Sequence, residues 1–386
     1  MDRRAFHKGV AAAALTAALP DPALPNPARA GYQGPNVILV RFGGGVRRAE
    51  TVVADTTYAP FLVHDLIPRG AFIPDLTIAQ LDGVDTSHAE GTLNLLTGRY
   101  LAYRDAGSGA LSDRLEPTEP TLFEYLRAAF AIPPHQALLV NGEDRPQEEF
   151  FTYGTHDHYG IAVRAEMLSL YRFKLYKFAE ILREGRAPED QLVAAATELD
   201  RLRAADARPM AEAQSAEVNA FWARWRAGHG DDGLRNARGD RLLTALALQA
   251  MATLQPRLMM VNYQDTDYVH WGNPTHYTRA IQIIDDGLRQ IVAAMDSLPF
   301  YAGNTVIVVT PDCGRDANPL MGVPFQHHFN TASARQVWAV LAGPRVARGV
   351  VMDRPADQSA IAPTIAALMG FRAGQSEGDA LATVLT

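Results

Sequence analysis

Residues 305–316, TVIVVTPDCGRD, form an apolar, β-branched run that ends in a carboxylate, a thiol, a glycine and an Arg-Asp pair. Such a run is typical of a buried parallel strand, and its polar end is typical of the loop that follows one. In open α/β sheets, ligands bind just outside the carboxyl ends of the strands. The stretch therefore predicts a parallel sheet with Asp312 and Cys313, the only cysteine of the chain, at the edge where such folds bind ligands.

Strand and helix signals alternate along most of the remaining chain. Further strands are predicted at the apolar runs 36–42, 71–77, 136–140, 258–263 and 336–342. Helices are predicted at 121–130, 277–295 and 358–369. This alternation predicts an α/β fold with a doubly wound, mostly parallel sheet flanked by helices.

Residues 160–254 differ in character, because they combine long helical periodicity with many Ala, Arg and Glu residues. Strand signals resume after this stretch. It is therefore predicted to be a helical insert within one α/β domain that spans residues 31–386, and we expect substrate specificity to lie in it and in the loops.

The first 30 residues have the features of an export signal. A basic start with Arg3-Arg4, Phe6 and Lys8 precedes an Ala-rich run and the small-residue site 28–30, Ala-Arg-Ala. The pattern resembles a twin-arginine signal, which implies a bacterial periplasmic or extracytoplasmic location. A frayed basic terminus is the alternative interpretation.

Charge, hydropathy and cysteine content exclude several other classes of protein. The formal net charge of −7 does not favour nucleic acid as a partner, and no stretch is long and apolar enough to predict a membrane span. A single cysteine excludes an intramolecular disulfide. The sequence gives no indication of oligomeric state.

Two more clusters of polar residues lie in loops that follow predicted strands, as Asp312 and Cys313 do. Asp265, Asp267 and His270 lie in one loop directly after the predicted strand 258–263, and His327-His328 lie in a loop after 305–310. Carboxylates with imidazoles suit zinc, manganese or iron. Since strand ends of a parallel sheet share one edge, the clusters are predicted to converge there.

Each cluster also has a structural interpretation. Either aspartate could cap the next helix or hold a turn, and a His-His pair is often simply solvated. A lone cysteine is more often a small buried apolar residue than a metal ligand. Taken together, the three clusters favour a metal site.

The order of several motifs resembles the alkaline phosphatase superfamily, and within it the sulfatase-like and phosphoglycerate-mutase-like branches. The motifs are NVILVRF at 36–42, LNLLTGRY at 93–100, PTLFEYLRAA at 120–129, VNYQDTDYVHWGN at 261–273, VIVVTPDCGRD at 306–316, the His-His pair and IAPTIAALMG at 361–370. The resemblance implies a two-metal hydrolase or transferase of phosphate or sulfate esters. It also implies a Ser, Thr or formylglycine nucleophile.

Carried over residue by residue, the resemblance implies two sites for divalent ions, with zinc favoured and manganese as the alternative. One site would use Asp267 or Asp265, with His270 and with His328 or His327. The other would use Asp312 and the position of Cys313, where the family normally has His.

The chain also departs from the family pattern. Gly43 stands where the first strand normally ends in a metal-binding Asp, and counting back from LLTG places the nucleophile near His88, with Thr86 and Ser87 as the nearest hydroxyls. No cysteine is available there for conversion to formylglycine. The sequence is therefore compatible with a one-metal site, a two-metal site or a degenerate site that has lost catalysis.

Two function hypotheses follow. The first is an exported metal-dependent hydrolase of a small anionic phosphate, phosphonate or sulfate ester, with Thr86 or Ser87 as nucleophile and Arg315 as a ligand of the substrate anion. The second is a catalytically degenerate relative that acts as a periplasmic binding or structural protein. Metal content of the purified protein distinguishes them.

Overall fold

The computed structural model describes residues 31–106, 115–141, 151–205, 214–231, 239–270, 272–317 and 325–386. The predicted export signal, residues 1–30, lies outside this part of the chain. Within it, no helix is long and apolar enough to cross a bilayer.

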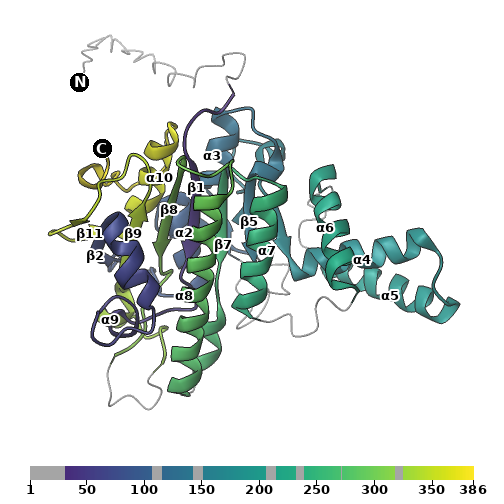
Figure 1. The fold of residues 1–386 in the computed structure, drawn as a ribbon, viewed down its shortest axis with the longest axis horizontal. Coiled ribbons are helices and arrows are strands. Elements are labelled where there is room, and N and C mark those ends of the chain that lie inside the picture. Colours follow the sequence, from purple (N-terminus) through teal and green to yellow (C-terminus); the bar gives the residue numbers. More distant parts are fainter. Residues whose placement is uncertain are drawn as a thin grey trace, which may run out of the picture.

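A nine-stranded mixed sheet forms the centre of the molecule (Figure 1). Its strands are β1 (Asn36–Arg41), β2 (Ala71–Thr77), β5 (Ala137–Asn141), β6 (Glu166–Ser169), β7 (Leu258–Asn262), β8 (Thr305–Thr310), β9 (Gln336–Ala342), β10 (Val350–Val351) and β11 (Ala356–Asp357). The order is β10-β2-β9-β8-β1-β7-β5-β6, with β11 also beside β2. A separate hairpin pairs β3 (Tyr103–Asp105) with β4 (Leu115–Pro117).

The five strands from β8 to β6 run parallel, which confirms the predicted doubly wound, mostly parallel sheet. β9 is antiparallel to both of its neighbours. In the register, Arg41 at the end of β1 lies opposite Asn262 of β7 and Thr310 of β8. The loops that leave these three central strands therefore start at the same edge of the sheet.

Helices cover both faces of the sheet (Figure 1). They are α1 (Arg48–Thr51), α2 (His88–Thr97), α3 (Leu122–Ala129), α4 (Leu170–Glu184), α5 (Glu189–Ala205), α6 (Ala216–His229), α7 (Asp240–Thr253), α8 (Pro274–Ser297), α9 (Ala332–Arg335) and α10 (Ile361–Met369). Ile38 and Val40 of β1 pack in one core with α7 and α8. Val37 and Leu39 pack in the other core with α2, α3 and α10. Each such buried aliphatic side chain contributes about 1.5–3 kcal/mol, which is why β1 is apolar on both sides.

The predicted insert 160–254 is smaller in the structure than in the sequence interpretation. β6 lies inside that range and pairs with β5 at the sheet edge, and α7 packs directly on the sheet. Only α4, α5 and α6 extend away from it, with α4 and α5 side by side (Figure 1). The four residues of β6, EMLS, are too few to produce a strand pattern in the sequence.

Candidate metal centre

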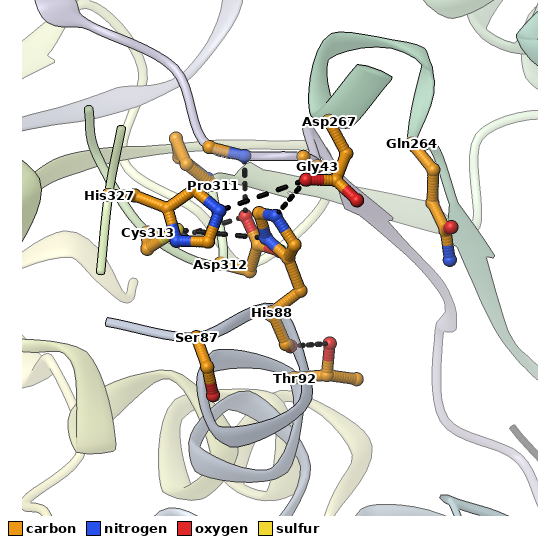
Figure 2. Close-up of polar contacts among 12 residues, drawn as sticks. Gly43, Ser87, His88, Thr92, Gln264, Asp267, Pro311, Asp312, Cys313 and His327 are labelled. Atoms are coloured by element: carbon orange, nitrogen blue, oxygen red, sulfur yellow. Dashed lines mark hydrogen bonds and ion pairs between the residues drawn. The ribbon is translucent and has the colours of Figure 1, made fainter. Parts of the chain in front are cut away.

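The candidate centre lies at the edge where β1, β7 and β8 end (Figure 2). Asp267 comes from the short helical turn Asp265–Val269 after β7, and Asp312 follows β8 by two residues. His88 is the first residue of α2, and His327 comes from the loop before α9. The parallel register brings these distant segments together.

One carboxylate oxygen is the focus of three imidazoles. Asp267 Oδ1 lies 2.7 Å from His88 Nε2, 2.7 Å from His270 Nε2 and 3.7 Å from His327 Nε2. Side-chain exposure is 21% for His88 and His270 and 24% for Asp267, so small solutes can reach this point.

The outer nitrogens of two of these imidazoles are fixed by oxygen acceptors. His270 Nδ1 lies 3.1 Å from Gln326 Oε1, whose amide orientation follows from the Gln326 Nε2 bond to the His270 carbonyl. His327 Nδ1 lies 2.7 Å from the Thr86 carbonyl oxygen. Both Nδ1 atoms therefore carry the proton, and in the neutral rings both Nε2 atoms present lone pairs toward Asp267.

Two acceptor nitrogens and a carboxylate cannot satisfy one another by hydrogen bonds. His327 Nε2 is buried and has no hydrogen-bond partner among the described residues. Burial, followed by the charge of His88, lowers the pKa of His327 to about 3, so this ring is neutral at ordinary pH. Burial opposes ionisation of Asp267, but the charge of His88 is the largest of the effects that lower its pKa well below the usual range. Asp267, His270 and His327, together with His88, thus form a group that could hold a divalent cation.

His88 bridges the two carboxylates of the centre. Its Nδ1 lies 2.8 Å from Asp312 Oδ2, and its Nε2 faces Asp267. Burial alone would lower the pKa of His88, but the charges of Asp267 and Asp312 outweigh it and raise the pKa well above the ordinary value. Asp312 is fully buried, and its Oδ1 accepts the backbone N–H groups of Gly45 and Cys313.

Cys313 lies beside Asp312, and with His88 these two residues form a second cluster that could hold a metal ion. The Sγ of Cys313 is 3.7 Å from His88 Nδ1, which is closer to Asp312 Oδ2. Burial, and then the charge of Asp312, raises the pKa of the thiol to about 11. Without a metal the side chain is therefore a neutral thiol at neutral pH, and an ion bound there would displace its proton.

The structure distinguishes the two predicted aspartates and the two predicted histidines. Asp265 points to the start of α7, where its Oδ2 accepts the backbone N–H of Asp240 at 3.0 Å. His328 is exposed and stacks on His270, with ring centroids 5.6 Å apart. Asp267 and His327 are the members that enter the centre.

The two predicted hydroxyl nucleophiles are engaged elsewhere. Thr86 is fully buried, and its Oγ1 donates to the carbonyl oxygen of His327. Ser87 is the N-cap of α2, where its Oγ accepts the backbone N–H of Glu90 at 3.3 Å, and it points away from the carboxylates in Figure 2. His88 lies where the family resemblance expects the nucleophile.

Arg315 does not face the site either. It is fully buried, and its guanidinium donates to the backbone carbonyls of Gly44, Gly45, Thr266 and Phe325. It therefore ties together the loops that carry the candidate ligands. With its donors used in this way, it is not available to a substrate anion.

Arg41 was not predicted as a residue of the centre. Its Nη1 lies 3.4 Å from Asp312 Oδ2, and both side chains are almost completely buried. The sequence feature that could have indicated it is a charged residue near the end of the apolar run NVILVRF, which is followed by three glycines. A buried charge needs a partner, so such a residue indicates a carboxylate nearby.

Solved structures with the same overall fold belong to the alkaline phosphatase superfamily. Wild-type alkaline phosphatase PafA is 10% identical, with a TM-score of 0.55, and the match covers 92% of this chain and 99% of that one. An alkaline phosphatase superfamily protein from Vibrio parahaemolyticus is 13% identical, with a TM-score of 0.53 and coverage of 92% and 71%. A 2-O GAG sulfatase is 12% identical, with a TM-score of 0.51 and coverage of 91% and 74%.

No family model matches this chain, and no curated protein sequence matches it. At these identities the likeness concerns the fold, which is that of the alkaline phosphatase superfamily.

Proposed function

We propose that this protein is a metal-dependent hydrolase of small anionic phosphate, phosphonate or sulfate esters, with one divalent ion held by Asp267, His270 and His327. The observation that carries the proposal is the convergence of the Nε2 atoms of two imidazoles on one carboxylate, one of them buried and without a hydrogen-bond partner among the described residues. Zinc suits this set of two nitrogens and one oxygen, and manganese is the alternative. A bound ion would act as a Lewis acid on an ester oxygen.

His88 is the proposed general base. Asp312 accepts the Nδ1–H of His88, which leaves Nε2 directed at the centre. A cation on Asp267 disfavours a second proton on His88 by like-charge repulsion, so the neutral ring is free to accept one. The oxygen of water then attacks phosphorus or sulfur, its proton passes to Nε2, and the departing ester oxygen takes that proton as the bond to it breaks.

The first test is metal content together with hydrolysis. Protein purified after saturation with Zn²⁺ or Mn²⁺ is expected to hold one ion and to cleave para-nitrophenyl phosphate or para-nitrophenyl sulfate. Asp267→Asn and His327→Asn are expected to lose both the ion and the activity. His276→Asn is the matched control, since His276 is exposed at the start of α8.

Each outcome separates the hypotheses. Activity that survives complete removal of metal would exclude the mechanism. One bound ion without hydrolysis of either ester would favour the second hypothesis, a binding protein with a degenerate site. Cleavage of only one ester would identify the transferred group.

We also propose that the protein is exported by a twin-arginine route, on the basis of Arg3-Arg4 and the Ala-rich run that follows. In a bacterial host, the full chain is expected in the periplasmic fraction. Replacement of both arginines by lysine is expected to keep it in the cytoplasm. Periplasmic recovery of the Lys-Lys variant would contradict this route.

A further inference from the structure

Arg41 is a fully charged side chain at the end of the central strand. It is 2% exposed, and its guanidinium contacts Asp312, the hydroxyl of Thr92 and the carbonyl of Tyr263. The metal-binding set Asp267, His270 and His327 does not include it. A buried cation at this position must have a role in the charge balance of the centre.

The side-chain space of residue 43 is already filled by the Tyr263 carbonyl and the Arg41 side chain. A Cβ built on Gly43 would lie 2.6 Å from Arg41 Nε and 3.1 Å from Arg41 Cζ, and 2.1 Å from the carbonyl oxygen of Tyr263. Arg41 is the last residue of β1, and Gly43 follows it by two residues in the loop. The family resemblance expects an acidic ligand at position 43. This chain instead has a glycine at position 43, and the guanidinium of Arg41 lies next to it.

Both oxygens of Asp312 already have polar partners, so an ion bound there with His88 and Cys313 would have to displace one of them. Oδ1 accepts the N–H groups of Gly45 at 3.3 Å and Cys313 at 2.9 Å. Oδ2 faces His88 Nδ1 at 2.8 Å and Arg41 Nη1 at 3.4 Å. A carboxylate offers about four lone-pair positions, so Asp312 is saturated.

We propose that the Arg41 guanidinium permanently replaces a second metal ion at Asp312, so that the chain binds one ion and Arg41 positions Asp312 and, through it, His88. This inference rests on the proposed function for the identity of the first site. Arg41 contacts Asp312, which in turn contacts His88, and it acts as a positioning residue.

Metal stoichiometry tests the replacement directly. Native mass spectrometry after Zn²⁺ saturation and removal of excess ion is expected to give one ion in the wild type and one in Arg41→Lys. Arg41→Glu places a second carboxylate beside Asp312 and is expected to bind one ion more than the wild type. Arg69→Glu makes the same charge change at an exposed ion pair with Asp296 and is expected to leave the count at one.

A milder variant guards against misfolding of Arg41→Glu. Arg41→Gln removes the charge but keeps length and polarity, and it is also expected to accept a second ion. Only the folded fraction, identified by circular dichroism and size exclusion, is counted. For the positioning role, Arg41→Gln is expected to lower kcat at least tenfold with little change in KM, and Arg41→Lys is expected to restore most of kcat.

The outcomes distinguish this inference from the proposed function. Two ions in the wild type would overturn the replacement by Arg41 and leave the hydrolase proposal intact. No ion in the wild type would overturn the hydrolase proposal, whereas a gain of one ion in either Arg41 variant would still support the replacement. No gain in a folded Arg41→Glu or Arg41→Gln protein would overturn it.

Discussion

The positions of protons on three imidazoles determine the chemistry of the centre. His270 and His327 donate from Nδ1 to oxygen acceptors and therefore present lone pairs to Asp267. His88 differs, because both of its nitrogens face carboxylates. This arrangement suits the proposed roles of two rings as metal ligands and of the third as a carrier of protons.

His88→Asn separates these roles. We expect the variant to keep one metal ion, since Asp267, His270 and His327 remain, and to lose about 10²–10⁴-fold in kcat, the usual contribution of a general base. Metal analysis and steady-state kinetics measure both quantities. His229→Asn, remote on α6, should change neither. Loss of the ion together with activity would instead identify His88 as a ligand.

Among the elements, α2 packs very closely against the backbone that follows β8. Gly91 lies in the interior of α2, and a Cβ there would lie 2.3 Å from the carbonyl oxygen of Asp312 and 3.0 Å from its Cβ. Backbone atoms cannot move aside as a flexible side chain can. The absence of a side chain at residue 91 therefore sets how closely His88 approaches Asp312.

Gly91→Ala should destabilise the protein, although alanine normally favours a helix. We expect a loss of about 1–3 kcal/mol in the free energy of unfolding, because overpacking outweighs the gain in helix propensity. Gly228→Ala in α6 meets nothing within 4 Å and should stabilise by about 0.5–1 kcal/mol. Urea denaturation measures both. Equal stabilisation by the two substitutions would contradict the close crossing.

Asp285 of α8 gives the protein a pH-dependent stability. Its oxygens accept the N–H groups of Phe61 and Leu62, each at 2.9 Å, at the start of the π-helical turn Leu62–Leu66. Burial raises the pKa of Asp285 to about 6, against the lowering effect of these hydrogen bonds. The folded state therefore binds the proton more tightly than the unfolded state, and stability from this group decreases as pH rises from about 4 to about 6.

The Asp285→Asn variant should lack this part of the pH dependence. Relative to the variant, the wild type is expected to lose about 1–3 kcal/mol of unfolding free energy between pH 4 and pH 7. Denaturation curves at several pH values measure the difference. Asp296→Asn on the same helix changes an exposed carboxylate and should leave the wild-type slope in place. An unchanged slope in Asp285→Asn would exclude this origin.

The strands were predictable because their signal is local. The β-branched runs of β1, β7 and β8 identify buried parallel strands, and the register then brings Asp312 near residues 264–270. The choice of Asp267 over Asp265 was not predictable, since both follow β7 and only the turn Asp265–Val269 directs one inward. The roles of Arg41 and Arg315 were not predictable either, because the partner of a buried cation depends on tertiary contacts.

At the scale of the whole molecule, the centre joins segments that are far apart in the chain. Residues 86–88, 264–270, 312–313 and 326–327 meet there, and Arg315 binds the backbone of three of the surrounding loops. The first of these segments begins a helix that packs on one face of the sheet, and the second leads into α8 on the other face. A ligand bound there therefore connects both layers.

Metal binding should consequently stabilise the entire fold. An ion that binds only the folded chain adds RT ln(1 + [L]/Kd), or about 2.7 kcal/mol at a free concentration of 100 Kd, which corresponds to a rise of a few degrees in Tm. Calorimetry of the wild type with and without Zn²⁺ is expected to show this rise and its dependence on ion concentration. Asp267→Asn should have the same Tm in both conditions, whereas His276→Asn should respond as the wild type does. A Tm that rises equally in Asp267→Asn would place the stabilising ion elsewhere, because the three imidazoles converge on the Asp267 carboxylate.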